Sequence, residues 1–282
     1  MFLKKFWLVF LSFFFLIDAL AFVAFWQYDL VSRPRVIFFN VGQGDSVFID
    51  LHRDNQILID GGDGNKILDE LGKYMPFYDR KIELIVMTHP DKDHMGGLVE
   101  VLKYYKVDLI LETGIKCDTT ICLEWDRLIT EKNIPVEYAE FGQIINLEEA
   151  NINVLYPFKN LKGQTIKNDN DTSVVLKVNI KNKSTENNSN SSCLLTGDAG
   201  FKVEKDLLGK NINLQSDILK VSHHGSKNST SDNFLKAIKP EKSIISVGKN
   251  SYGHPAEELT DRLKNINSEI LRTDEMGDLT FY

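Results

Sequence analysis

One short stretch, IELIVMTHPDKDHMGG at residues 82–97, constrains the fold more than any other part of the chain. Its first half is a nearly continuous apolar run, which is typical of a strand buried on both faces of an α/β sheet. Its second half places His89, Asp91, Asp93 and His94 directly after that strand. Because open α/β sheets hold their ligand sites at the carboxyl ends of strands, the stretch predicts a functional site at one edge of a layered α/β domain.

The same arrangement recurs later in the chain. Strands are predicted within residues 36–62, 152–157, 173–180, 192–198, 216–222 and 242–248, and helices at 66–75, 96–105, 233–238 and 256–266. Asp198 ends the strand SCLLTGD, while His223 and His224 follow the strand SDILKVS. One such polar cluster alone is more often a solvated turn, but four of the six histidines stand at strand ends beside carboxylates. The recurrence favours a metal site.

The candidate ligands suit a pair of divalent ions that share a carboxylate. Catalytic divalent metals take histidine nitrogen and aspartate oxygen, and each of two paired ions needs about four ligands. The candidate metal ligands are His89, Asp91, Asp93, His94, Asp198, and one or both of His223 and His224. A zinc–thiolate site is not supported, because the three cysteines form no CxxC motif.

The composition indicates one large domain over residues 30–282, since 282 residues with 43% hydrophobic content can bury one substantial core. The net charge of −7 argues against binding nucleic acid by bulk electrostatics, although a local basic groove is compatible with it. The polar stretch 181–192 is interpreted as a solvated loop. Cys117 and Cys122 either pair in an oxidising compartment or stay free thiols, and the sequence does not choose.

The N-terminal segment, residues 1–29, is predicted to be a membrane anchor. Residues 6–26 form an apolar run that only Asp18 interrupts, about the length that a bilayer crossing needs. A cleavable signal peptide is the alternative, but the run continues past the small-residue site at 19–21. With Lys4 and Lys5 before the run, the positive-inside rule predicts a single-pass protein of the cell membrane with its domain on the extracytoplasmic side.

In order along the chain, NVGQGDS, LIDGG, THPDKDHMGG, NDTS, LLTGD, KVSHHGS, YGHP and RTDEMGDLTFY resemble the motifs of the metallo-β-lactamase superfamily. Within it they look most like the soluble hydrolase domain of ComEC DNA-uptake proteins. The resemblance runs from about residue 36 to the end. It implies a four-layer αββα sandwich, with His89 and Asp91 on the first metal, Asp93 and His94 on the second, Asp198 between them, and His223 or His224 completing the second site.

Two departures from the wider superfamily affect the expected metal. The usual HxHxDH pattern has Asp91 at its second histidine, and no histidine occurs between residues 95 and 197. ComEC-type domains share this pattern, so it does not suggest an inactive protein. An oxygen-rich first site suits harder ions, which makes Mn²⁺ a competitor of Zn²⁺, and it argues against β-lactamase activity.

Further residues are assigned to the surroundings of the metals. Asp45 and Asp60, together with Asn170 and Ser173, are candidates for holding the ligands through hydrogen bonds or for contacting substrate. His254, in the loop motif YGHP, is a candidate phosphate contact or proton donor.

These features together predict an exported, membrane-anchored phosphodiesterase, most simply a nuclease acting on DNA, in which Asp93 and Asp198 are catalytic as metal ligands and His254 assists. Other DNA-uptake or envelope proteins are possible partners, because this chain carries no many-helix channel. An envelope phosphodiesterase resembling phosphorylcholine esterases is the second interpretation. A non-catalytic metal-containing binding module is the third, disfavoured because the ligand set is open and rich in carboxylates.

Overall fold

The computed structural model describes residues 34–51, 55–181 and 191–282, together with residues 7, 10, 13–19, 21 and 22. Within those described residues, no helix is both long and apolar enough to cross a membrane. Most of the predicted anchor, residues 1–29, falls outside the described part, as do residues 52–54 of one predicted turn and most of the polar loop at 181–192. These expectations stay predictions.

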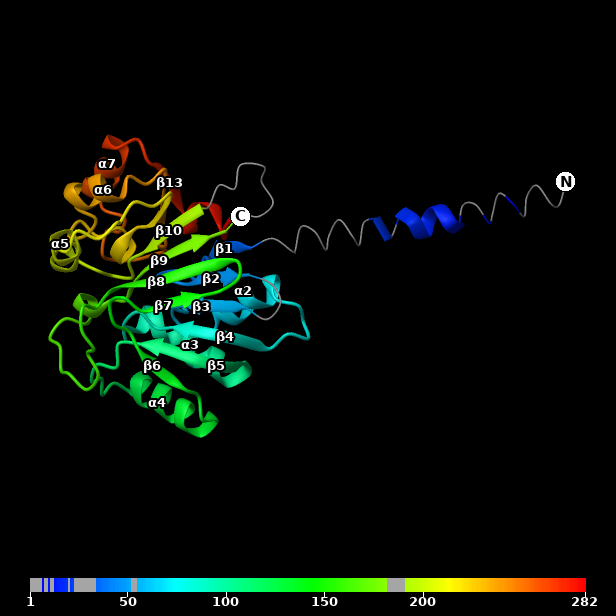
Figure 1. Ribbon diagram of the computed structural model, residues 1–282, viewed down its shortest axis with the longest axis horizontal. Coiled ribbons are helices and arrows are strands. Elements are labelled where there is room, and N and C mark those ends of the chain that lie inside the picture. The colour runs from blue at the N-terminus through cyan, green and yellow to red at the C-terminus, as the bar shows by residue number, and fades with distance from the viewer. Residues whose placement is uncertain are drawn as a thin grey trace.

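The first of two sheets has the strand order β14-β1-β2-β3-β4-β5-β6. Its strands are β1 (Arg35–Phe38), β2 (Val47–Asp50), β3 (Gln56–Ile59), β4 (Lys81–Val86), β5 (Lys106–Glu112), β6 (Val136–Tyr138) and β14 (Leu279–Phe281). Strands β3 to β6 pair in parallel, whereas β14, β1, β2 and β3 pair antiparallel. The last strand of the chain therefore lies beside the first described strand, as Figure 1 shows.

The second sheet has the order β13-β12-β11-β10-β9-β8-β7. Its strands are β7 (Ile144–Asn146), β8 (Ala150–Tyr156), β9 (Val175–Ile180), β10 (Ser191–Leu195), β11 (Ile218–Lys220), β12 (Lys242–Ile245) and β13 (Glu269–Arg272). Strands β10 to β13 are parallel and β7 to β10 are antiparallel. Each sheet thus has a parallel half, and parallel strands are the ones that collect ligand residues at their carboxyl ends.

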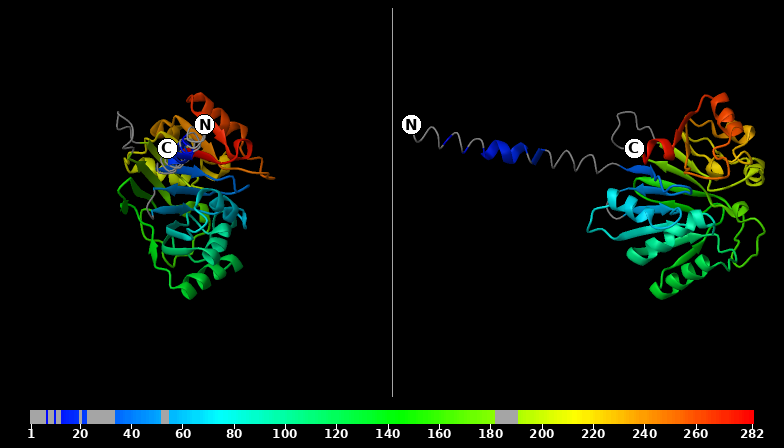
Figure 2. Two further views of the ribbon diagram at one scale, coloured as in Figure 1. Left: turned by 90° about the vertical axis from the view of Figure 1, so that its right-hand side faces the viewer. Right: turned by 180° about the vertical axis from the view of Figure 1, so that it is seen from behind.

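Helices cover the outer face of each sheet (Figure 2). They are α2 (Lys66–Tyr74), α3 (Lys92–Tyr104) and α4 (Thr120–Lys132) on the first sheet, α5 (Phe201–Gly209), α6 (Asp232–Ile238) and α7 (Glu257–Asn265) on the second, and the short α8 (Thr273–Met276). Two 3₁₀ turns, η1 (Asp169–Thr172) and η2 (Ser222–Gly225), lie in loops. The layers are helices, sheet, sheet and helices, in agreement with the predicted αββα order.

Three buried clusters hold these layers together. Between the sheets, Phe38 and Val86 of the first pack with Leu176 and Leu195 of the second. Separate clusters join the first sheet to α2–α4 and the second to α5–α7. Each fully buried aliphatic or aromatic side chain contributes about 1.5–3 kcal/mol. This frame is what fixes the strand ends that carry the polar side chains.

The directions of the strands separate two edges of the sandwich. Because β1 is antiparallel to β2 and β2 is antiparallel to β3, β1 runs in the same direction as β3, β4 and β5. Arg35, the first residue of β1, therefore stands at one edge, and the residues that follow β4 and β5 stand at the opposite edge.

The structure moves the start of one predicted helix by four residues and adds elements. Helix α3 begins at Lys92, four residues before the predicted start, so Asp93 and His94 lie in its first turn. Strand β5 and helix α4 were not predicted, because charges at Lys106 and Asp108 interrupt the apolar pattern of the strand. Helix α4 begins after Thr119, whose hydroxyl accepts the Cys122 backbone N–H at 3.4 Å.

Candidate metal centre

Asp60, at the end of β3, is the hydrogen-bonding hub of the site. Its carboxylate accepts the backbone N–H of Thr88 at 2.8 Å and the Thr88 hydroxyl at 2.7 Å. It lies 2.7 Å from His94 Nδ1 as well. The Thr88 hydroxyl gives its proton to Asp60, so Thr88 Oγ1 can accept a hydrogen bond from His89 Nδ1, which lies 3.0 Å away. One buried carboxylate thus orients two histidines, directly and through one hydroxyl.

Two glycines, Gly97 of α3 and Gly61 after β3, let α3 approach Asp60 closely. A Cβ atom on Gly97 would collide with the carbonyl oxygen of Gly61, and one on Gly61 would lie 2.5 Å from the Leu98 nitrogen. Gly61 N–H also donates to the His94 carbonyl at 2.7 Å. Glycine at both positions therefore brings the first turn of α3 against the β3 end, within reach of Asp60.

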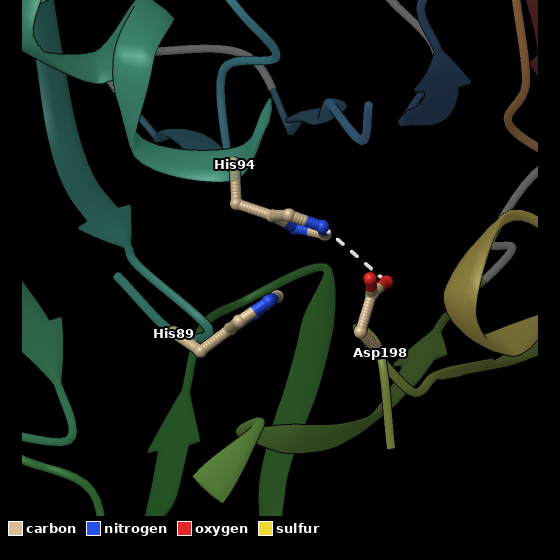
Figure 3. A group of neighbouring side chains, drawn as sticks. All are labelled: His89, His94 and Asp198. Carbon is tan, nitrogen blue, oxygen red and sulfur yellow. Dashed lines mark ion pairs between the residues drawn. The ribbon is translucent and has the colours of Figure 1, made fainter. Parts of the chain in front are cut away.

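Figure 3 shows how three predicted ligands converge. His89 follows β4, His94 lies in the first turn of α3, and Asp198 follows β10 of the other sheet. The two imidazole rings have centroids 4.1 Å apart, and His94 Nε2 is 3.3 Å from Asp198 Oδ1. All three side chains are buried. Both sheets therefore contribute to a single cluster.

Asp198 is held at the centre by the loop that precedes α5. Its backbone N–H donates to Ser173 Oγ at 3.1 Å. The predicted residue Ser173 therefore lies next to the cluster and holds the backbone of Asp198. Gly197, with φ of 50°, adopts the left-handed conformation that turns the chain here.

The adjacent histidines of η2 separate into a buried one and a partly exposed one. Both have positive φ, 51° for His223 and 52° for His224. His224 is 2% exposed, and its Nε2 lies 3.2 Å from Asp93 Oδ2 and 3.5 Å from Asp198 Oδ2. The side chain of His223 is 35% exposed, with Nε2 3.8 Å from Asp198 Oδ2. The geometry places His224 in the ligand position and His223 at the rim.

Four sets of three potential ligand atoms lie within 4.8 Å of one another in the described structure: His89, His94 and Asp198; Asp93, His94 and His224; Asp45, Asp198 and His224; and Asp45, Asp60 and His94. The first set and the second match the two halves of the predicted centre. Asp91 adjoins the first, because its Oδ2 is 3.5 Å from His89 Nε2. It is the N-cap residue of α3, yet its side chain makes no capping hydrogen bond, which leaves the carboxylate available.

The buried polar atoms of this cluster fit metal ions. Within the described chain, His89 Nε2, His94 Nε2, His224 Nε2 and Asp198 Oδ1 are buried without a hydrogen-bond partner. His224 Nδ1, in contrast, has the Ser246 carbonyl at 3.0 Å. A carbonyl only accepts, so Nδ1 carries a proton, and in the neutral ring the lone pair on Nε2 is available to a metal, as it is in His89. Unpartnered buried polar atoms are costly, and a metal would satisfy them together.

The charges of the cluster shift its pKa values strongly. Burial lowers the pKa of His224, but Asp198 and Asp45 outweigh burial and raise it to about 10. Burial also lowers the pKa of His94, but Asp198 and Asp60 outweigh burial and raise it well above its usual range. Burial raises the pKa of Asp198, whereas His224 and His94 hold it well below the ordinary value. The protein thus keeps carboxylates ionised in a buried site, which is the condition for cation binding.

A buried lysine near the centre was not predicted. Lys220, at the end of β11, is 1% exposed. Its ammonium forms an ion pair with Asp45, donates to the Gly197 carbonyl at 3.0 Å and lies 3.9 Å from Asp198 Oδ1. Asp45 in turn is 3.2 Å from His224 Nδ1. The only sequence signal was a charged residue inside the apolar strand SDILKVS.

Asp169 is the second residue that sequence reasoning missed. It opens η1, directly before the predicted residue Asn170. Burial raises the pKa of Asp169, the charge of Asp91 raises it further, and His89 lowers it. Those electrostatic partners place Asp169 near the first half of the centre, which contains His89 and Asp91.

The rim of the centre is formed by His223, His254 and Asn170. The ring of His254 has its centroid 5.5 Å from that of His223, and Asn170 Nδ2 lies 3.3 Å from His223 Nδ1. Burial, followed by the charges of His223 and His224, lowers the pKa of His254. Burial also lowers that of His223. Both rings are therefore neutral at pH 7 and each can donate one N–H hydrogen bond.

A buried cluster of histidines and aspartates, at one edge of paired mixed sheets covered by helices, defines a class of α/β sandwich proteins with a paired-metal centre. The family model for the metallo-beta-lactamase superfamily matches residues 39–177. This match confirms the resemblance to that superfamily seen in the motifs of the chain.

Its relatives include competence proteins. ComE operon protein 3 of Bacillus subtilis (strain 168) is 29% identical over 273 residues, which cover 89% of this chain and 33% of that protein. Competence protein ComA of Neisseria gonorrhoeae is 32% identical over 204 residues, covering 72% and 25%. The chain spans a third or less of the length of these two relatives. The metallo-beta-lactamase fold protein YhfI of Bacillus subtilis has a TM-score of 0.55 at 10% identity, covering 89% of this chain and all of that one, and shows the shared fold.

Proposed function

We propose that this protein is a phosphodiesterase that hydrolyses DNA with two divalent ions, Zn²⁺ or Mn²⁺. The observation that carries the proposal is the convergence of three unpartnered histidine Nε2 atoms on Asp198, with Asp91 and Asp93 beside them. A donor set with three nitrogens and three carboxylates suits hydrolytic metals and is unlike the closed thiolate sets of structural zinc.

The first ion would be held by His89, Asp91 and Asp198, and the second by Asp93, His94, His224 and Asp198. Bound ions supply Lewis-acid polarisation of a phosphoryl oxygen and a hydroxide nucleophile at neutral pH. Asp60 and Ser246 keep the Nδ1 protons of His94 and His224, which turns both Nε2 atoms inward. The Lys220 ammonium offsets part of the negative charge of Asp45 and Asp198, which would otherwise repel a phosphodiester.

The partly exposed residues of the rim are suited to contact the phosphate. His223 and His254 are neutral at pH 7 and present N–H donors without adding charge. Asn170 orients His223 by their contact at 3.3 Å. These residues can bind phosphate oxygens and direct the leaving group, whereas a lowered pKa makes His254 a poor source of a proton.

DNA is favoured as substrate by the likeness to proteins named as competence and recombination proteins. An extracytoplasmic, membrane-anchored location remains part of the proposal. It is supported by the apolar run at residues 6–26 and by the pairing of Cys117 with Cys122, since disulfides persist in oxidising compartments. Other DNA-uptake or envelope proteins would then be its partners, since the relatives compared above are named as competence proteins.

An envelope phosphodiester is the second candidate substrate, because the two-metal chemistry and the neutral rim are equally suited to it. The test uses the full chain, stripped of metal and reloaded separately with Mn²⁺ or Zn²⁺. Single- and double-stranded DNA are assayed beside bis-p-nitrophenyl phosphate and a phosphorylcholine ester.

Metal-dependent DNA cleavage that disappears in Asp93→Asn and Asp198→Asn is the expected result. Asp261→Asn, an exposed carboxylate on α7, is the matched control and keeps full activity. Cleavage of the phosphorylcholine ester without cleavage of DNA would show that the protein is an envelope phosphodiesterase and not a nuclease. Full activity in the Asp93→Asn/Asp198→Asn double variant would refute both.

A further inference from the structure

A pocket of about 620 Å³ adjoins the metal centre on the side of the first metal. It begins at Pro90, the residue between His89 and Asp91, and extends past the end of β5 toward α4. Nothing in the hydrolytic chemistry described above uses its interior. A substrate phosphodiester held at the metals would have one of its substituents beside this opening.

The outer wall of the pocket is built from two loops that are fastened to each other. Gly163 N–H donates to the Gly114 carbonyl at 2.7 Å, and Lys116 N–H donates to the Gln164 carbonyl at 2.8 Å. The Cys117–Cys122 disulfide then ties the first loop to α4. The wall is thereby fixed in place before any ligand arrives, which lowers the entropic cost of binding.

The interior of the pocket contains polar groups that can form further hydrogen bonds. Thr113 is fully buried, and its hydroxyl has no hydrogen-bond partner among the described residues. Glu112, 9% exposed, accepts the indole N–H of Trp125 at 2.8 Å on one oxygen. Burial raises the pKa of Glu112, although its hydrogen bond with Trp125 lowers it. A buried hydroxyl without a partner costs free energy that a ligand could recover.

The aromatic and thioether side chains of the lining favour a flat ring. Trp125 and Tyr138 are among the lining residues, and Met87 and Met95 add polarisable thioethers that contact aromatic rings well. The Tyr138 ring already has the Lys162 ammonium 4.4 Å from its centroid. Flat aromatic heterocycles stack on such surfaces.

The charges in the lining exclude a second phosphate. The two cations, Lys116 and Lys162, are outnumbered by the three acids Glu112, Asp118 and Asp126, so there is no excess of positive charge. The mixture of polar groups is equally unsuited to a lipid chain. A neutral ligand that combines an aromatic face with donors and acceptors at its edge fits these walls.

We propose that this pocket binds the nucleobase of a nucleotide adjoining the scissile phosphate, with the base against Tyr138 and the edge of the base bonded to Glu112 and Thr113. The inference rests on the proposed function, because it makes a nucleic acid the substrate class of the same centre. Contacts to one base add affinity through its π face and allow preference among bases through its edge.

The test measures binding without turnover. The full chain carries Trp7→Phe and Trp26→Phe, so that Trp125 is its single tryptophan and reports on the pocket. Metal-stripped protein is titrated with each of the four deoxynucleoside 5′-monophosphates and with 2-deoxyribose 5-phosphate, which lacks a base. We expect quenching of Trp125 by the nucleotides, with at least one binding tenfold or more tightly than the sugar phosphate.

Substitutions then locate the site. Thr113→Val and Glu112→Gln keep the shape of the pocket, and each should weaken nucleotide binding about three- to tenfold while leaving binding of the sugar phosphate unchanged. Tyr138→Leu, in the half-buried wall, provides a second route if a buried variant does not fold. Glu131→Gln, an exposed carboxylate of α4 paired with Arg127, is the matched control and should have no effect.

The outcomes separate this inference from the proposed function. Equal binding of nucleotides and sugar phosphate, or nucleotide binding that survives in Thr113→Val, Glu112→Gln and Tyr138→Leu alike, overturns the inference even if the metal-loaded protein cleaves DNA. Nucleotide binding that depends on these residues supports it, even in a protein whose metal-loaded form cleaves only other diesters, in which case the proposed function alone fails.

Discussion

His94 Nδ1 lies 2.7 Å from Asp60 Oδ2, and that same oxygen accepts the hydroxyl of Thr88, which in turn contacts His89. Asp60 therefore selects the protonated nitrogen of one histidine directly and of another through the hydroxyl. The relationship links one residue that holds no metal to both halves of the centre.

Asp60→Asn should weaken metal binding about 10- to 100-fold, because an amide can offer His94 a donor and stabilise the wrong tautomer. Asparagine tolerates the positive φ of 55° at this position, so the backbone should be retained. Metal affinity is measured by competition with a chromophoric chelator. Asp63→Asn, three residues on and exposed, is the control. Equal affinities in the two variants would contradict the role given to Asp60.

The adjacent pair His223 and His224 offers an internal comparison. His224→Gln should lose one of two metal ions, because His224 Nε2 lies among the carboxylates of the second site. His223→Gln should keep both ions and lose activity on DNA, since this residue lies at the rim. Metal content is counted by mass spectrometry after gel filtration. The reverse pattern would show that the two roles are exchanged.

Metal binding should release protons at neutral pH. Asp198 and Asp45 overcome burial and raise the pKa of His224 to about 10. In the metal-free protein the His224 ring therefore carries a proton on both nitrogens at pH 7. A ligand histidine must be neutral, so the apparent affinity should rise with pH, about tenfold per pH unit for each proton released. Calorimetry in two buffers with different ionisation heats counts the protons. An affinity that is constant between about pH 6 and 8 would contradict the prediction.

The Cys117–Cys122 disulfide closes a short loop before α4, and its removal should lower the free energy of unfolding by about 2 kcal/mol. Cys117→Ser/Cys122→Ser is compared with the parent chain by urea unfolding. Dithiothreitol should destabilise the parent by a similar amount and leave the double variant unchanged. Destabilisation of the double variant by the reductant would indicate an effect unrelated to this bond, since Cys193 is buried and unpaired.

The convergence of His89, His94 and Asp198 could be predicted from the sequence, because each follows a strand with a strong apolar pattern and parallel strands end at one edge. The αββα order came from the resemblance of the motifs. The weaker elements β5 and α4 were missed, and with them the walls of the nucleobase pocket, because their apolar periodicity is interrupted by charges.

The division between His223 and His224 depends on two consecutive positive-φ residues, which no propensity of histidine predicts. The Lys220–Asp45 ion pair joins strand β11 to a glycine turn that is 175 residues away in sequence, and only the packing of the two sheets brings them together. The sequence therefore located the ligands and the orienting residue Asp60, but not Lys220, which neutralises part of the negative charge around them.

The direction of β1 bears on which molecules can reach the metals. Arg35 stands at one edge of the sandwich and the histidine cluster at the other, so the chain enters the domain at the end remote from its chemistry. If residues 1–29 hold the protein to a bilayer, the metal centre would face away from that surface. Polymer strands that approach from outside would then meet it first, while the headgroups of the anchoring leaflet stay on the far side of the domain. That orientation gives an incoming nucleic acid an advantage in access over a membrane phosphodiester.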